Sequence, residues 1–177
     1  MGYVILGFFL IVLYGLSVIV RDMNRFVVTP YTVRSDKINR QYTIVMLSDL
    51  HNKTYGRENE KLVRAIEDCH PDCIMTAGDM YTSVKGSRFD NALALLGALA
   101  KRFPVYNGNH EHKTAEHPDY FDHMYETYTE KLRGMGLEPL VNTHVILPEV
   151  NIDVCGLQIG REYFKHFKKK EMPGDYM

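Results

Sequence analysis

The 177-residue sequence contains no excess of charge of either sign, since 21 basic residues are balanced by 22 acidic ones. This balance argues against a nucleic-acid binder that works through a general basic field, and no nucleic-acid partner is expected. There are only three cysteines, and an odd number argues against a complete disulfide framework. The sequence also contains no phosphate-binding loop of the nucleotide hydrolases, no dinucleotide-binding fingerprint and no Ser-His-Asp grouping. The sequence therefore gives no support for a phosphate-binding-loop nucleotide hydrolase, a dinucleotide-dependent enzyme or a Ser-His-Asp hydrolase.

Charge is absent altogether from the first 20 residues. Between Tyr3 and Val20, only Gly7, Gly15 and Ser17 fall outside the apolar set. As a helix, this run would extend about 27 Å, which is just enough to cross the core of a bilayer. We therefore predict a single-pass membrane protein with an anchor over residues 1–22, held in the membrane by residues 3–20, and a polar domain over residues 23–177.

Two alternatives to an uncleaved anchor stay open at this stage. A cleaved secretory signal normally begins with positive charge and ends at a small-x-small site, and the sequence around residues 19–22 offers neither. A buried core helix would carry polar residues at helical spacing, which the run does not. Arg21 and Arg25 follow the run and slightly favour a cytoplasmic position for the polar domain, but the side of the membrane stays open.

Short apolar stretches alternate with amphipathic ones in the polar domain. We expect strands over residues 41–47, 73–77 and 104–107, and helices over 58–69, 89–100 and 119–135. This alternation is typical of an α/β fold with parallel strands, and a strand such as 41–47 is buried on both faces if helices cover the sheet. An edge strand interrupted by Pro30 is expected over 26–33, and a hairpin over 140–147 and 151–159.

Polar residues follow each of the three expected parallel strands. They are Asp49 and His51 after the first, Asp79 after the second, and Asn109, His110 and Glu111 after the third. The carboxyl ends of parallel strands form the ligand crevice of an open α/β sheet, so these side chains should meet at one rim. Carboxylate and amide oxygens with imidazole nitrogen suit Mn, Fe or Zn rather than calcium. Two such ions can hold a bridging hydroxide and clamp a phosphate for in-line attack.

The same residues resemble the first three motifs of the calcineurin-like metallophosphoesterases. The motifs are Asp49-x-His51, Gly78-Asp79 and Gly108-Asn109-His110-Glu111, and the resemblance covers about residues 38–160. The longer sequences that contain these motifs, residues 47–52, 71–79 and 106–111, are similar to those of the membrane-associated bacterial branch of that family. The fold implied is a two-sheet αββα sandwich, preceded here by one transmembrane helix.

The resemblance also implies a role for each residue. Asp49 and His51 would bind the first of two divalent ions, Asp79 would bridge both, and Asn109 would bind the second. His110 would stabilise the phosphoryl transition state or protonate the leaving oxygen, and Glu111 would orient the His110 ring. The expected substrate is a phosphomonoester or phosphodiester, and a membrane anchor makes a lipid-linked one a natural candidate.

Family members complete this site with a later histidine and a Gly-His-x-His motif. No Gly-His dipeptide occurs among the 177 residues, and the one His-x-His sequence is His110 to His112. We therefore expect residues 23–177 to be the N-terminal portion of a metallophosphoesterase domain, with little or no hydrolysis by this chain alone. Three readings stay open: a truncated enzyme, a non-catalytic membrane-tethered metal-binding remnant, or a site that a partner chain completes.

Other histidines and cysteines have simpler interpretations. His144 is expected to face solvent rather than to replace the later family ligand, and Cys73 is expected to be a buried apolar side chain. The basic run over residues 165–170 is read as a solvated helix face, with contact to anionic lipid as the alternative.

Overall fold

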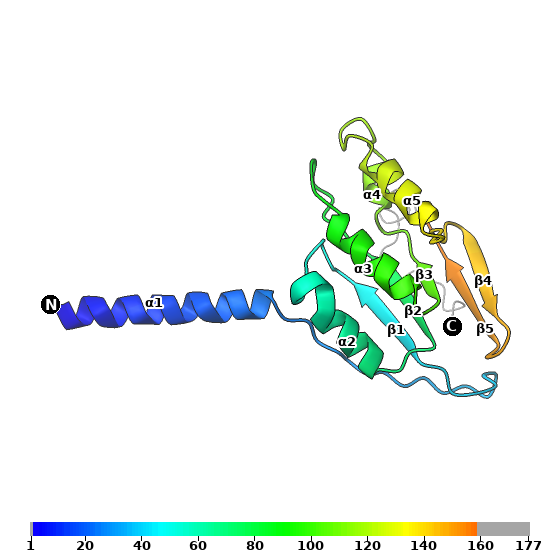
Figure 1. Ribbon diagram of the computed structural model, residues 1–177, viewed down its shortest axis with the longest axis horizontal. Helices are drawn as coiled ribbons and strands as arrows, with labels where there is room; N and C mark the ends of the chain where they lie inside the picture. Colours follow the sequence, from blue (N-terminus) through cyan, green and yellow to red (C-terminus); the bar gives the residue numbers. More distant parts are fainter. Residues whose placement is uncertain (1, 159–177) are drawn as a thin grey trace, which may run out of the picture.

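The computed structural model describes residues 2–158, so the basic run over 165–170 lies outside the described residues. Figure 1 shows a long N-terminal helix projecting from an α/β domain. The helices are α1 (Gly2–Met23), α2 (Glu60–Asp68), α3 (Asp90–Ala100), α4 (His112–Ala115) and α5 (Met124–Gly134), with a 3-10 turn, η1, at Arg57–Asn59. The strands are β1 (Ile44–Ser48), β2 (Cys73–Gly78), β3 (Val105–Asn107), β4 (Thr143–Leu147) and β5 (Ile152–Gly156).

The first three strands form a parallel sheet in the order β1-β2-β3. Val45 lies opposite Ile74, which in turn lies opposite Val105. The connections between these strands contain α2 and α3, because parallel neighbours need a long crossover that a helix supplies well. The predicted α/β fold with parallel strands is therefore confirmed.

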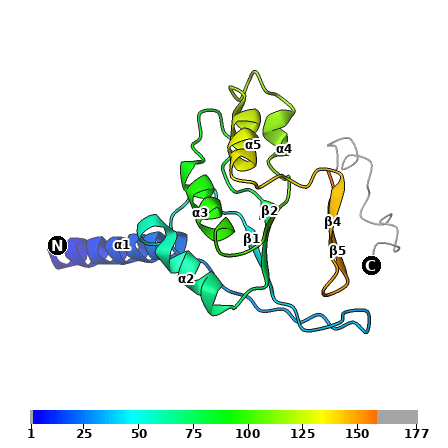
Figure 2. The ribbon, with the colours of Figure 1, turned by 45° about the vertical axis from the view of Figure 1, so that its right-hand side comes forward.

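Helices cover one face of this sheet, and the hydrophobic core lies between the two layers. Val45 and Val105 pack against a buried cluster that includes Ile66 of α2, Leu96 of α3 and Tyr128 of α5. Figure 2 shows α2 and α3 on one side of the sheet and the β4–β5 hairpin on the other. This order of layers agrees with part of a metallophosphoesterase sandwich.

The face of the sheet toward the hairpin carries no helix among the described residues. Met46 and Met75 point to this side, and the side chain of Met46 is 65% exposed. Burial of β1 on both faces was expected only if helices covered the whole sheet, and among the described residues this condition is met on one face alone. The alternating burial of β1 follows from a helical layer on one face only.

The hairpin is a separate two-stranded antiparallel sheet, as predicted. It joins the parallel sheet at the end of β3, where the Leu140 amide donates to the Asn107 carbonyl at 2.8 Å and Pro139 forms a bridge with Asn107. This junction places the start of a second sheet beside the carboxyl ends of the first.

Two expectations about secondary structure are wrong. Residues 26–33 form no strand, and Tyr31 within them is 87% exposed. Pro30 has no amide hydrogen to donate to a neighbouring strand, and no described strand pairs with this segment. The helix expected over 119–135 begins only at Met124. Asp122 and His123 adopt left-handed backbone conformations, with φ of 51° and 55°, which interrupt a right-handed helix. The short helix α4 was not anticipated.

The N-terminal helix has the length and composition needed to cross a membrane. Its apolar window, Ile5–Met23, has a mean hydropathy of 2.0, and none of it is buried against the rest of the chain. A core helix would be mostly buried, so this exposure argues against the buried-helix alternative.

The Asp72 side chain links the residues that precede β1 and β2 by hydrogen bonds. Its carboxylate accepts from the Thr43 amide at 2.7 Å and from Arg40 at 3.2 Å. The Thr43 amide, with help from Arg40, holds the pKa of Asp72 below its usual value of 3.8. A lowered folded-state pKa means that the stabilisation is present above the unfolded-state pKa and is lost as the pH falls through the folded-state value.

We therefore expect Asp72→Ala to lower the free energy of unfolding of the polar domain by about 1 kcal/mol at pH 7. The gap between the two proteins should begin to shrink below about pH 4, where the Asp72 carboxyl of the unfolded chain becomes protonated, and should continue to shrink as the pH falls through the lower folded-state pKa. Urea unfolding at pH 7 and pH 3 measures both, with the exposed Asp68→Ala as a control. An equal gap at the two pH values would contradict the assignment.

Candidate metal centre

The loops that follow β1, β2 and β3 are joined to one another by backbone hydrogen bonds. The Asp49 amide donates to the Gly78 carbonyl at 3.3 Å, and the His51 amide donates to the Asp79 carbonyl at 3.0 Å. The Gly108 amide donates to the Thr76 carbonyl at 2.8 Å, which brings the third loop against the second strand. The three predicted motifs therefore meet at one edge of the parallel sheet.

The backbone at this edge is strained at the residues expected to bind metal. Asp49, His51 and Asp79 have φ values of 57°, 49° and 53°, in the left-handed region that residues with a Cβ rarely occupy. Such conformations cost free energy and cluster at functional sites, where the surrounding structure enforces them. Asp49 and Asp79 directly follow β1 and β2, so the left-handed conformations lie where the first two motifs leave their strands.

Four of the expected site residues lie as two pairs, each of one aspartate and one histidine. Asp49 Oδ1 is 3.7 Å from His51 Nε2, and Asp79 Oδ2 is 3.5 Å from His110 Nε2. Within the described part of the chain, the side chains of Asp49, His51 and Asp79 do not bring three ligand atoms within 4.8 Å of one another. Asp79 and His110 lie within ion-pair distance, and the role of His110 beside the metals rather than on them stays a prediction.

Asn109 is held by two residues that sequence reasoning missed. The Tyr125 hydroxyl of α5 donates to Asn109 Oδ1, and Asn109 Nδ2 donates to Gln158 Oε1 at 3.0 Å. Burial raises the pKa of the Tyr125 phenol, so it stays protonated and acts as the donor. These contacts fix which way the amide oxygen points. No sequence signal marks Tyr125 or Gln158, because both reach Asn109 only through the tertiary fold.

Glu111 is buried beneath the site. Its carboxylate accepts from the Met80 amide at 2.8 Å, which ties the third motif to the residue after Asp79. Burial is the main cause that raises the pKa of this carboxyl. The contact seen is thus with the backbone of the second motif, and the orientation of His110 by Glu111 stays a prediction.

A cleft of about 660 Å³ opens beside these residues, between the parallel sheet and the hairpin. Asp79, Asn109 and His110 line its polar part, together with Ser83 and Lys113. Neither Ser83 nor Lys113 was predicted from the sequence, since a single serine or lysine in a loop or helix carries no signal. Lys113 supplies positive charge next to the expected metal ligands.

Gly78 is required by the packing of the second motif against the third. Its φ is +111°, and a Cβ at this position would collide with the Cβ of His110 and lie 3.0 Å from the His110 Cα. Both the backbone conformation and the space therefore favour glycine immediately before Asp79.

We expect Gly78→Ala to destabilise the domain by about 3 kcal/mol, from backbone strain together with overpacking, and to displace His110. Gly86→Ala is the matched control, since Gly86 also has a positive φ, +75°, but nothing lies within 4 Å of its added Cβ. The control should lose only the strain, about 1 kcal/mol. Thermal unfolding of the two variants separates the cost of backbone strain from the cost of the clash with His110. Equal losses of stability in the two variants would show that the His110 contact is unimportant.

The residues at this edge fit a divalent metal. Two carboxylates, one amide oxygen and one imidazole are the donors that Mn, Fe and Zn accept in proteins. Asp49, His51 and His110 are exposed and Asp79 is half-buried, so an ion can reach them from solvent. The strained backbones of Asp49, His51 and Asp79 add a second reason to regard this edge as functional.

Comparison with known proteins gives two positive findings. Residues 42–169 match the calcineurin-like phosphoesterase family. Over 119 residues, the chain is 34% identical to a "Transmembrane protein with metallophosphoesterase domain" from Danio rerio. The aligned region covers 63% of this chain and 25% of that protein, so the chain spans about a quarter of the length of the relative.

No solved structure matches the chain. The matching relative comes from a fish, so assignment to the bacterial branch stays a prediction. Membership of the family itself is supported by both findings. The three motifs meet at one sheet edge, and the family match extends over residues 42–169, most of the chain. This chain belongs to the calcineurin-like phosphoesterase family.

Proposed function

We propose that the site at the ends of β1, β2 and β3 is that of a metal-dependent phosphoric ester hydrolase, acting on phosphomonoesters or phosphodiesters. Asp49, His51, Asp79 and Asn109 would hold two divalent ions of Mn, Fe or Zn. The observation that supports this most is that the loops after three successive parallel strands, which carry Asp49, His51, Asp79 and Asn109, are joined by backbone hydrogen bonds at one edge of the sheet. Family membership supports the reaction class.

When bound, a pair of such ions supplies a water-derived nucleophile at neutral pH and neutralises the charge of the phosphate. The chain's own residues provide the rest. His110 lies beside Asp79, where its ring can stabilise the phosphoryl group or donate a proton to the leaving oxygen. Lys113 lines the same cleft and can pair with a non-reacting phosphate oxygen.

The described residues supply only part of the ligand set of a two-metal centre. No Gly-His-x-His motif occurs among the 177 residues, and His144 is expected to face solvent rather than to replace the later family histidine. We propose that this chain by itself binds metal weakly and hydrolyses esters slowly or not at all. The alternative function is that of a membrane-tethered, non-catalytic metal-binding protein.

The N-terminal helix and the transmembrane relative support association with a membrane. We propose that residues 1–22 form the anchor and that residues 23–177 carry the phosphoesterase portion. A phosphate ester linked to a lipid is the substrate class that best suits an enzyme held at a bilayer surface. Arg21 and Arg25, just after the apolar run, favour the cytoplasmic side for the domain.

Hydrolysis of an aryl phosphodiester and an aryl phosphomonoester tests the proposed function. The purified chain with added Mn²⁺ should show slow turnover above the metal-only background, and Asp79→Ala should return it to that background. Turnover that is equal in the parent and in Asp79→Ala would come from another source and contradict the site. An absence of turnover in a chain that binds Mn²⁺ would establish the non-catalytic alternative.

A further inference from the structure

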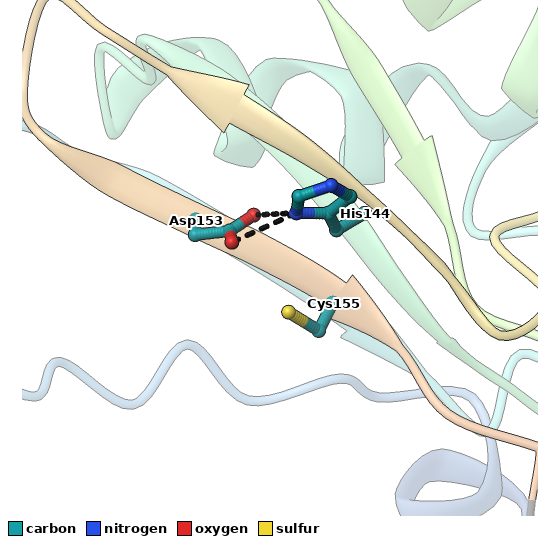
Figure 3. A group of neighbouring side chains, drawn as sticks. All are labelled: His144, Asp153 and Cys155. Atoms are coloured by element: carbon teal, nitrogen blue, oxygen red, sulfur yellow. Dashed lines mark hydrogen bonds and ion pairs between the residues drawn. The ribbon is translucent and has the colours of Figure 1, made fainter.

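The exposed face of the β4–β5 hairpin carries three metal-type ligands of different chemistry. His144 of β4 lies directly opposite Cys155 of β5, and Asp153 lies two residues before Cys155 on the same face. Figure 3 shows the three side chains grouped on one side of the two strands. One ligand atom from each residue lies within 4.8 Å of the other two.

The group is already partly assembled. His144 Nδ1 is 2.9 Å and 2.8 Å from the two carboxylate oxygens of Asp153. The thiol of Cys155 is free and exposed. None of these residues belongs to the three motifs at the ends of β1–β3, so the group is a feature that the proposed phosphoesterase chemistry does not use.

The backbone beneath the group is fixed at both ends of the hairpin. The Gln158 amide donates to Asn142 Oδ1 at 2.9 Å at one end, and the Val150 amide donates to the Leu147 carbonyl at 3.2 Å at the other. Five residue pairs between the strands keep the register. Ligands carried by such a paired segment are better positioned than ligands on separate loops.

From this arrangement we propose that His144, Asp153 and Cys155 form a binding site for a zinc-type divalent ion. Thiolate, imidazole and carboxylate are the ligands that zinc prefers in proteins. Ligand atoms around a tetrahedral zinc ion lie about 3.3–3.7 Å apart. The His144 and Asp153 atoms, 2.8 Å apart, must therefore separate slightly, and the Cys155 sulfur, which lies within 4.8 Å of both, must approach by at most about 1.5 Å. All three are exposed and free to make that adjustment.

Binding exchanges the contact between His144 and Asp153 for a bond from each residue to the ion. Cys155 binds as the thiolate and releases its proton to solvent. Three protein ligands leave the fourth tetrahedral position to water or to an external ligand, as in zinc sites that act on or bind other molecules. The site is therefore an open one rather than a closed structural one.

Cobalt(II), a common substitute for zinc, tests the site in the full chain kept reduced in detergent. Cobalt bound to a thiolate absorbs in the near ultraviolet by sulfur-to-metal charge transfer. The phosphoesterase ligands Asp49, His51, Asp79 and Asn109 contain no sulfur, so this band separates the hairpin from the sites at the strand ends, and Cys155 is the one exposed thiol of the three in the chain. We expect the parent chain to develop the band with about one equivalent of cobalt, and zinc to displace it.

Cys155→Ser should abolish the band, and His144→Ala or Asp153→Asn should weaken cobalt binding at least about tenfold. Two controls should keep it: Cys69→Ser, which alters a half-buried thiol bonded to the Ala65 carbonyl, and Ile146→Ala, which alters an exposed side chain on the same face. A parent chain without the band, or a band that survives Cys155→Ser, would overturn the proposal. Unchanged affinity in both His144→Ala and Asp153→Asn would do the same.

Discussion

Replacing Asp79 with asparagine is expected to weaken the binding of Mn²⁺ by the chain at least about 100-fold, since the loss of groups that only support metal ligands already costs about 10–100-fold. Asp79 follows β2, the central strand of the parallel sheet, and its carboxylate faces the cleft shared with His110 and Asn109. A carboxylate can bridge two cations, whereas a neutral amide offers one weak oxygen ligand. Titration with Mn²⁺ followed by electron paramagnetic resonance of the free ion measures this change.

Asp119→Asn is the matched control for this experiment. The Asp119 side chain is 99% exposed and contacts His123 rather than the strand-end residues, so its variant should bind Mn²⁺ like the parent. The domain should remain folded in both variants because Asp and Asn have nearly the same shape. Equal loss in the two variants would mean that Mn²⁺ binds to the surface by net charge and not at the strand ends.

Removal of residues 1–22 is expected to move the protein from the membrane fraction to the supernatant almost completely. The described apolar side chains of α1 are mostly exposed, and none of its apolar window, Ile5–Met23, is buried by the domain. A helix of this kind gains free energy from transfer into a bilayer, about 0.3–0.6 kcal/mol for each Leu, Ile, Phe or Val near the centre. Fractionation after an alkaline carbonate wash measures the distribution.

The comparison needs one further control. Replacing Leu10 with arginine keeps the chain length but should cost about 3 kcal/mol at the bilayer centre, and so should reduce the membrane fraction. N-terminal sequencing of the full chain from membranes should read Met1 or Gly2. A mature protein that begins after residue 20 would show a cleaved signal instead, and a truncated protein that stays in the washed membranes would show that the anchor lies elsewhere.

Much of the fold was predictable because the apolar pattern is strong where burial is strong. The strand over 73–77 and the helix over 89–100 agree closely with β2 and α3, since both are central to the core. The segment over 26–33 has a strand-like composition but no neighbour to pair with, and pairing is a tertiary property. The start of α5 was missed because the left-handed conformations of Asp122 and His123 depend on packing that the sequence does not display.

The candidate site was likewise predictable only in part. The positions of Asp49, Asp79 and Asn109 followed from a simple rule, that parallel strands end at one edge. The partners of these residues did not follow from it, because Tyr125 reaches Asn109 from a helix 16 residues later. Likewise, His144 was expected to face solvent and does, but its pairing with Asp153 depends on the register of the hairpin. Local spacing thus places ligands, and tertiary packing decides what holds them.

The central claim is that the ends of β1, β2 and β3 form a centre for divalent metal ions. Anomalous diffraction from crystals of the full chain grown with Mn²⁺ tests this most directly, since it locates the ion. We predict an anomalous peak in contact with the carboxylates of Asp49 and Asp79 and the imidazole of His51. Crystals that contain Mn²⁺ but show no peak at this edge of the sheet would contradict the claim.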